Sequence, residues 1–283
     1  MVALKDVEFS YKRGVHVLQG ISAEFEGGHV YGLLGLNGAG KTTLMKIIAS
    51  AFFPKAGSCR TLGSDVAKRD RRMLEDMYIL GQDPQLTGRG GAAETVTQQI
   101  APFYPRFDTG FLEEGLRQFG VPAKARINKL SHGERRIVEV CAALSANTRL
   151  LLLDEPTNGL DIPSRDVFRR VVASWCSDER CMVVSTHQVK DIESLVDRIA
   201  VLHDHRIVLC EDLFRISERV AVSLESTEPD GDSLIHKEKS PGGWVAVREK
   251  PNQSGDSIDL EILFKATIAA SGRLVRAIEE DRR

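Results

Sequence analysis

The sequence has little that would place it in a membrane or export it. None of its apolar runs approaches the ~18–20 uncharged residues of a transmembrane helix, and residues 1–6 lack the pattern of a signal peptide. The chain taken alone is therefore expected to be cytosolic.

Cysteine is also scarce. The cysteines are odd in number, scattered, and without a C-x-x-C pair, which argues against a disulfide framework and a zinc knuckle. They are Cys59, Cys141, Cys176, Cys181 and Cys210. The pattern His203-Asp204-His205 resembles a pair of metal ligands, but it lies between two apolar runs, so we expect a hairpin turn there instead.

An excess of charge of either sign is missing as well. The 38 basic residues are balanced by 40 acidic ones, so no large basic field is available for nucleic acid, and no nucleic-acid partner is expected. A hydrophobic fraction of 42% in 283 residues is enough for a substantial core in one or two domains.

Residues 35–43 read G-L-N-G-A-G-K-T-T and match the phosphate-loop pattern G-x-x-x-x-G-K-[ST] in full. An apolar run precedes them and a second one follows, as expected for strand, loop and helix. Glycines let backbone N–H groups converge on a polyphosphate, and the helix N-terminus adds a favourable dipole. Lys41 is expected to reach the β- and γ-phosphates, and Thr42 to hold Mg²⁺. The predicted nucleotide-binding residues of this loop are Asn37, Gly38, Ala39, Gly40, Lys41, Thr42 and Thr43.

A second acidic motif follows four consecutive leucines in residues 149–155, R-L-L-L-L-D-E. The leucines predict a strand buried on both faces, and parallel strands present ligands at their carboxyl ends. Asp154 is suited to orient Mg²⁺, and Glu155 to polarise the attacking water. An isolated acidic pair would more often cap a helix, but the intact phosphate loop favours ATP hydrolysis.

Several further motifs resemble those of the ABC ATPases. Residues 130–134, L-S-H-G-E, resemble the signature L-S-G-G-Q, and residues 154–161, D-E-P-T-N-G-L-D, match the Walker B motif and D-loop. Gln82 resembles the Q-loop glutamine, His187 the switch histidine, and Tyr11 the aromatic residue that stacks on adenine. Six elements occur in family order across residues 1–210, roughly three quarters of the chain.

The resemblance implies a set of roles for ATP and Mg²⁺. Glu155, His187 and Gln82 would be catalytic, and Thr42, Gln82 and Asp154 would serve the metal. Beyond the phosphate loop, the resemblance assigns nucleotide contacts to Tyr11, Ser131, Gly133 and Asp161.

In the family the signature contacts the γ-phosphate bound to another copy of the domain. This chain has one phosphate loop and one signature, so the resemblance implies a homodimer or a paralogous ATPase subunit. His132 and Glu134 depart from the family signature. We interpret the site as active, at an ordinary or a modified rate; the alternative is a degenerate half-site that works only beside a paralogue.

The predicted fold is an α/β P-loop NTPase of the ABC ATPase type. It has a mainly parallel sheet, an antiparallel β subdomain, a helical subdomain inserted at about residues 83–145, and a small C-terminal α+β appendage. We expect an ATPase domain at 1–213 and an appendage at 214–283. Alternation predicts strands at 220–224 and 244–248, separated by a turn-rich segment, and residues 260–268 predict an amphipathic helix. The appendage is a packed extension or, alternatively, a regulatory or dimer-supporting element.

The resemblance favours the ATP-hydrolysing subunit of an ABC transporter, peripheral on the cytoplasmic face of the cell membrane and acting on a separately encoded permease. Residues 103–108, F-Y-P-R-F-D, resemble exporter-type subunits for drugs or peptides. The aromatic residues Phe103, Tyr104 and Phe107 would dock on the permease or, alternatively, pack the helical subdomain.

Two other functions remain open. One is a soluble ABC-type ATPase on the ribosome or nucleic acid. The other, a P-loop kinase or GTPase, is opposed by the signature and by residues 128–131, N-K-L-S, which lack the Asp of N-K-x-D.

Overall fold

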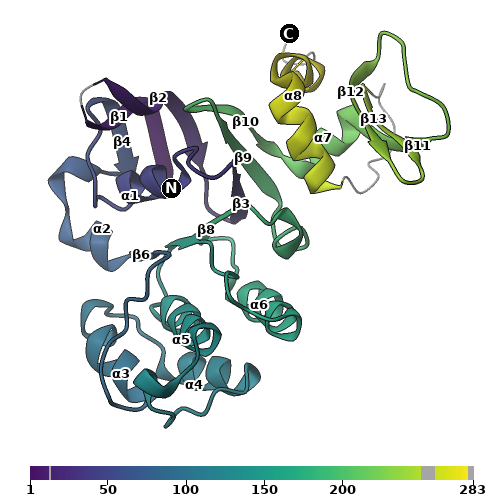
Figure 1. Ribbon diagram of the computed structural model, residues 1–283. Helices are drawn as coiled ribbons and strands as arrows, with labels where there is room; N and C mark the ends of the chain where they lie inside the picture. The colour runs from purple at the N-terminus through teal and green to yellow at the C-terminus, as the bar shows by residue number, and fades with distance from the viewer. Residues whose placement is uncertain (13, 250–258, 280–283) are drawn as a thin grey trace.

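The computed structural model describes residues 1–12, 14–249 and 259–279. These residues form three β-sheets with helices packed around them (Figure 1). Within the described residues, no helix is both long and apolar enough to cross a membrane.

The central sheet has six strands in the order β10-β9-β3-β8-β7-β6, and all neighbours are parallel except β10 and β9. Its strands are β3 (His29–Leu34), β6 (Met77–Leu80), β7 (Leu150–Asp154), β8 (Cys181–Thr186), β9 (Arg198–His203) and β10 (Arg206–Asp212). The four leucines of β7 are fully buried, as expected for a strand that is covered on both faces. The predicted, mainly parallel sheet is therefore confirmed.

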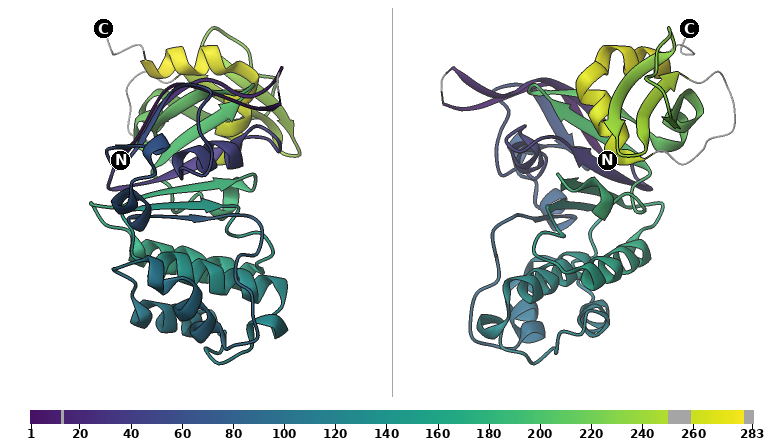
Figure 2. Two further views of the ribbon diagram at one scale, coloured as in Figure 1. Left: turned by 90° about the vertical axis from the view of Figure 1, so that its left-hand side faces the viewer. Right: turned by 45° about the vertical axis from the view of Figure 1, so that its right-hand side comes forward.

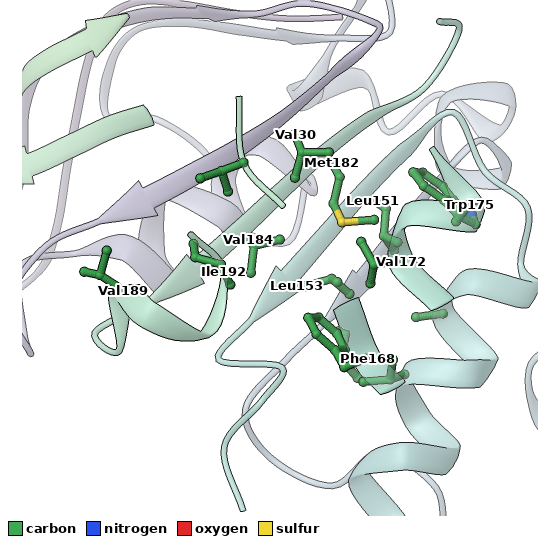
Figure 3. Packing of buried hydrophobic residues seen from close by; sticks show 14 of the residues in the cluster. Val30, Leu151, Leu153, Phe168, Val172, Trp175, Met182, Val184, Val189 and Ile192 are labelled. Carbon is green, nitrogen blue, oxygen red and sulfur yellow. The ribbon is translucent and has the colours of Figure 1, made fainter. Parts of the chain in front are cut away.

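Alternate residues of the central strands supply two separate cores. On one face, Leu151, Leu153 and Val184 pack against Phe168 and other residues of α6 (Ile162–Trp175) (Figure 3). The residues of opposite parity pack with α1 (Lys41–Ile48); they include Leu33, Leu150, Leu152 and Val183. Helix α1 follows the phosphate loop, so this packing against the central sheet holds the end of the loop in place.

The N-terminal strands form a separate antiparallel sheet in the order β2-β1-β4-β5, which confirms the predicted β subdomain. Its strands are β1 (Val2–Lys12), β2 (Val15–Phe25), β4 (Ala56–Thr61) and β5 (Ser64–Asp65). The short helices η1 (Val66–Lys68) and α2 (Arg71–Glu75) lead from it to β6. Asp70 caps α2 by accepting hydrogen bonds from two backbone N–H groups.

The predicted helical subdomain lies between β6 and β7. Figures 1 and 2 place its helices at the end of the molecule opposite the C-terminal appendage. The helices are α3 (Ala92–Gln99), η2 (Ala101–Phe103), α4 (Thr109–Gln118), η3 (Ile127–Lys129) and α5 (His132–Ser145). Helix α5 is buried along most of its length, so it anchors the subdomain to the central sheet.

The C-terminal segment contains a three-stranded antiparallel sheet and two helices. These elements are α7 (Leu213–Arg219), β11 (Val220–Glu225), β12 (Leu234–Ser240), β13 (Gly243–Glu249) and α8 (Leu260–Glu279). The predictions of β11, β13 and α8 were correct, but the turn-rich interpretation of 226–243 was wrong for β12. The charged residues of this segment were interpreted as a turn. They are compatible with a strand because β12 lies at the edge of its sheet, where charged side chains are common. The boundary between 213 and 214 stays a prediction.

Helix α8 packs on the short helix η4 (Val189–Asp191) as well as on its own sheet. The carboxylate of Glu193 accepts a hydrogen bond from the backbone N–H of Leu260 at 2.9 Å. Lys190 lies 3.5 Å from Glu261. The C-terminal helix therefore contacts the segment that follows His187. The predicted hairpin turn at His203–His205 is present between β9 and β10.

Candidate functional site

Four neighbouring parallel strands bring the predicted motifs to one edge of the central sheet. In the sheet order β3-β8-β7-β6, Leu34 pairs with Thr186, Ser185 with Asp154, and Leu153 with Leu80. The residues that follow these strand ends are the phosphate loop, His187, Glu155 and the segment containing Gln82. Ligands bind at this edge of open α/β sheets.

A cavity of about 540 Å³ lies at this edge. It is lined by Tyr11, Val17, Asn37, Gly38, Ala39, Gly40, Lys41, Thr42, Thr43, Gln82, Glu155, Asn158 and His187. The cavity therefore combines all seven predicted loop residues with three predicted catalytic residues and the predicted aromatic residue.

The glycines of the phosphate loop are required by close packing as well as by conformation. Gly40 has φ +111°, and a Cβ there would lie 2.9 Å from Cδ2 of Leu18. A Cβ at Gly35 would lie 2.6 Å from the carbonyl oxygen of Leu202. Larger residues would push the loop away from β2 and β9. The phosphate loop is thus packed closely against the antiparallel sheet at Gly40 and against the central sheet at Gly35.

Lys41 is folded back into this loop. Its Nζ donates hydrogen bonds to the carbonyl oxygens of Gly35 at 2.7 Å and Leu36 at 3.3 Å. Burial lowers the pKa of the Lys41 ammonium, against the opposing influence of the Glu155 and Asp154 carboxylates. The cation is therefore held inside the loop, where phosphate oxygens could replace carbonyl oxygens as its partners.

Thr42, Asp154 and Gln82 form one hydrogen-bonded chain. The hydroxyl of Thr42 donates to Asp154 Oδ2 at 2.6 Å, and Gln82 Nε2 donates to Thr42 Oγ1 at 3.1 Å. The hydroxyl of Ser185 donates to Asp154 Oδ1. Asp154 is 1% exposed, so its carboxylate is fixed by neighbours on β8 and in the phosphate loop.

Glu155 and His187 form the second contact between strand ends. His187 Nδ1 lies 2.9 Å from Glu155 Oε1, and both side chains face the cavity. Glu155 has φ +49°, a left-handed conformation that is uncommon outside glycine. Such conformations occur where the surroundings hold a functional residue in place.

Tyr11 lies at the mouth of the cavity. Its ring is 57% exposed, and its hydroxyl is 2.8 Å from Thr43 Oγ1. Phe9 and Phe52 contact it edge-on, with ring centroids 5.2 and 5.8 Å away. An exposed aromatic ring held by two others is suited to stack on a base.

The signature residues have local partners. Ser131 caps α5 by accepting a hydrogen bond from the N–H of Glu134 at 3.2 Å, and the Glu134 carboxylate accepts from the N–H of Ser131 at 2.8 Å. The bond from the Ser131 N–H holds the pKa of the Glu134 carboxyl below its ordinary value. The unusual Glu134 therefore stabilises the start of the helix.

The D-loop and the segment after His187 share one buried carboxylate. Asp191 accepts hydrogen bonds from the Thr157 hydroxyl and from Arg165 Nη1, each at 2.7 Å. Arg165 Nε also donates to the carbonyl of Leu160 at 3.2 Å. Asp191, which lies in η4, therefore connects the segment after β7 with α6.

The cavity fits a nucleoside triphosphate with Mg²⁺. Thr42, Asp154 and Gln82 offer hydroxyl, carboxylate and amide groups, and oxygen atoms are the ligands that Mg²⁺ prefers. Backbone N–H groups and Lys41 suit the phosphates. Bound Mg²⁺ would neutralise the charge that develops on phosphate oxygens.

Not every predicted site residue lines this cavity. Among the described residues, Asp154 lies behind its lining, while Ser131, Gly133 and Asp161 contribute nothing to it. Asp161 caps α6 by accepting from the N–H of Ser164 at 2.9 Å. The side chain and the backbone N–H of Ser164 hold the pKa of Asp161 below its ordinary value.

Sequence reasoning missed other residues. Val17 and Asn158 line the cavity, and Ser185 and Arg136 contact Asp154. Asn158 and Ser185 lie beside recognised motifs, which was the available signal; Val17 had only its place on a strand near the loop.

Comparisons with known proteins agree with these motifs. The family model described as "ABC transporter" matches residues 18–158. The ABC transporter ATP-binding protein YtrB of Bacillus subtilis (strain 168) is 27% identical over 81% of this chain and 78% of its own length. The arabinose import ATP-binding protein AraG of Paraburkholderia xenovorans (strain LB400) is 31% identical over 84% of this chain, which spans only 48% of AraG.

A solved structure shows the same fold. The dimeric structure of the ATP-binding cassette MJ0796 in a post-hydrolysis state, bound to ADP and Pi, has a TM-score of 0.67 and 23% identity. The match covers 75% of this chain and 99% of that one. From the strand-end geometry, the family match and the shared fold together, this chain contains an ATP-hydrolysing domain of the ABC ATPase type.

Proposed function

We propose that this chain is the ATPase subunit that drives a separate membrane permease from the cytoplasmic face, and that it does so as a dimer around two ATP molecules. The observation that carries the transport proposal is a second cavity, next to the strand that delivers Gln82.

In the nucleotide site, Glu155 acts as the general base toward the attacking water, and His187 orients its carboxylate. Their 2.9 Å contact supports this division of roles. Thr42 and Asp154 hold Mg²⁺, with Gln82 completing the site, and Lys41 binds the β- and γ-phosphates. Tyr11 stacks on the adenine.

The dimer supplies the groups that the cavity lacks. Ser131, Gly133 and Asp161 lie outside the cavity of their own chain, although the family resemblance assigns them to a nucleotide. A second copy related by a two-fold axis would bring them to the γ-phosphate side of the site. A paralogous subunit could occupy the same place.

The second cavity, of about 510 Å³, lies between the central sheet and the helical subdomain. Its lining includes Met77 and Ile79 of β6, Phe103 and Tyr104 of the helical subdomain, and also Arg69 and Arg71. Because Gln82 follows β6, a segment bound here would contact the strand that carries it. We name this cavity the β6 groove.

The two aromatic residues of the β6 groove differ in burial. Tyr104 contacts the ring of Tyr78, with centroids 5.2 Å apart, and burial raises the pKa of its hydroxyl to about 12. Phe103 is 68% exposed. Phe103 is therefore the better anchor for a permease segment, while Tyr104 also packs the helical subdomain.

The test is purification of the tagged chain from detergent-solubilised membranes of cells that express it. We expect a multi-span membrane protein to co-purify with the parent chain and to be lost with Phe103→Ala. Phe214→Ala is the matched control, because Phe214 is also 68% exposed but lies on α7. Recovery of ribosomes or nucleic acid in place of a membrane protein would favour the soluble alternative. Equal recovery with both variants would exclude docking at Phe103.

The transported substrate and direction are further predictions. Residues 103–108 favour export of a drug or peptide, whereas AraG is named for arabinose import. Transport assays with vesicles that contain the co-purified permease would decide between the two directions.

A further inference from the structure

Helix α5 carries a buried pair of opposite charges that the roles above do not use. Arg136 and Glu139 are 4% and 3% exposed, and Arg136 Nη1 lies 3.5 Å from Glu139 Oε2. Neither residue belongs to the lining of the nucleotide cavity. Buried charges are retained at a large desolvation cost, so their specific contacts need an explanation.

Arg136 binds the backbone at the ends of two central strands. Its Nη2 donates to the carbonyl oxygens of Asp154 at 2.6 Å and Glu155 at 3.0 Å. Its Nη1 donates to the carbonyl oxygen of Gly81 at 2.7 Å. One guanidinium therefore joins the end of β7 to the residue directly before Gln82.

Glu139 binds the other side of the Gln82 segment. Its Oε1 accepts hydrogen bonds from the N–H groups of Gln85 at 2.6 Å and Leu86 at 3.3 Å. The segment from Gly81 to Leu86 is thus held at its beginning by the cation and at its end by the anion. Both side chains come from α5, the helix that begins within the signature. Hydrogen bonds from this helix therefore hold the segment that contains Gln82.

The contact with Glu155 bears on its conformation. Glu155 has φ +49°, which an L-residue adopts only when its surroundings hold it there. Its N–H donates to Ser185 O at 3.0 Å, and its carbonyl accepts from Arg136. The two bonds fix both peptide groups of the residue and so fix the direction in which its carboxylate leaves the chain.

We propose that Arg136 and Glu139 are positioning residues for ATP hydrolysis. Arg136 sets the backbone of Glu155, and the pair sets Gln82 relative to it, so that both side chains reach the nucleotide cavity in one arrangement. Neither side chain contacts the nucleotide. The proposal rests on the ATPase activity and not on the permease, the dimer or the direction of transport.

The principal variant is the double substitution Arg136→Met/Glu139→Leu, which removes both charges at similar volume and leaves no unpaired buried charge. We expect kcat to fall at least about tenfold, because a misplaced general base loses much of its ~10²–10⁴-fold contribution. KM for ATP should stay within about twofold, since the phosphate loop is intact. The backbone groups that lose their partners should lower the melting temperature, but the variant should stay folded at the assay temperature and its melting temperature should still rise with MgATP.

Arg136→Lys gives a second test that keeps the charge opposite Glu139. One ammonium cannot reproduce the planar fork that reaches three carbonyl oxygens, so kcat should lie between those of the parent and the double variant. The matched control is Arg117→Ala/Glu114→Ala, which removes an exposed pair at the same i,i+3 spacing on α4. It should leave kcat and KM unchanged.

A third comparison tests whether the pair acts through Glu155. Single-turnover hydrolysis by Glu155→Gln should not slow appreciably further when the double substitution is added, because groups that act as a unit are not additive. Parental kcat in both the double variant and Arg136→Lys would overturn the proposal. So would a kcat loss no larger than the unfolded fraction of the variant explains, or a rise in KM alone.

Discussion

The imidazole of His132 lies directly over Gly159, so the signature and the D-loop of the same chain are in contact. A Cβ at Gly159 would be 2.7 Å from His132 Nδ1. The contact continues one residue later, where a Cβ at Gly133 would be 2.7 Å from the carbonyl oxygen of Gly159. The histidine that replaces the first signature glycine is thus accommodated because position 159 has no side chain.

Gly159→Ala should destabilise the protein in two ways. Gly159 has φ +81°, where alanine costs on the order of 1–3 kcal/mol, and the new methyl group would collide with His132. Adding His132→Gly should restore the stability that is lost through the collision. The loss of stability that is due to the φ of residue 159 should remain. Chemical denaturation of the single and double variants measures both parts.

Gly63→Ala is the control for the backbone part alone. Gly63 has φ +82°, and nothing lies within 4 Å of its added Cβ. Its destabilisation should be smaller than that of Gly159→Ala, and His132→Gly should not change it. Equal losses at 63 and 159 would mean that His132 moves away without cost.

Glu155→Gln should nearly abolish ATP hydrolysis while ATP still binds. The amide keeps the shape but cannot accept the proton, and losing a general base typically lowers the rate ~10²–10⁴-fold. Steady-state ATPase assays and nucleotide-dependent thermal shifts measure the two effects. A parental rate in this variant would remove Glu155 from the catalytic role.

Lys41→Met should change the pH dependence of stability in the absence of nucleotide. Burial lowers the pKa of folded Lys41 from its ordinary value of 10.5. Between the two pKa values the unfolded chain binds more protons, so rising pH stabilises the folded parent. Below the folded pKa, the full cost of burying the ammonium is present.

The measurement is the melting temperature of the parent minus that of Lys41→Met, from about pH 8 to pH 10.5, the ordinary lysine range. This difference should increase with pH, since other titrating groups are common to both proteins. The variant should also lose the thermal shift with MgATP. A difference that is flat or falls with pH would contradict a lowered pKa at Lys41.

The nucleotide cavity was largely predictable from the sequence because its residues follow strands with strong local signals. The four leucines before Asp154 predict a buried strand, and the glycines around Lys41 predict a phosphate-binding loop. In both cases a few neighbouring positions indicate the secondary structure and the chemical role together. The Arg136–Glu139 pair has no such signal. Its partners are backbone groups of residues 81, 85, 86, 154 and 155, and backbone groups carry no sequence pattern.

The same distinction explains the errors elsewhere. The contact of His132 with Gly159 joins the start of α5 to a loop that is distant in sequence. The periodic pattern of apolar residues therefore cannot predict this contact. In β12 the charged residues resembled a solvated turn, although Ile235 is buried. An edge strand reveals itself mainly through its pairing partner, here β13.

Leu263→Ala tests whether the appendage is a packed extension. Leu263 on α8 is fully buried in the same core cluster as α6, and such a truncation costs about 2–5 kcal/mol. We expect that loss in global unfolding, with kcat per folded molecule retained. The control is Leu224→Ala, because Leu224 is 63% exposed on β11. A large kcat change without a stability change would instead favour a regulatory appendage.

The shared carboxylate of Asp191 has a consequence for the two nucleotides of the proposed dimer. Asp191 joins the D-loop, which would face the partner's ATP, to η4, which follows His187 at the chain's own ATP. A displacement at one nucleotide would thereby reach the other within a single chain. ATP hydrolysis by the parent is therefore expected to be cooperative, with a Hill coefficient above one, and Asp191→Asn should bring the dependence on ATP closer to hyperbolic.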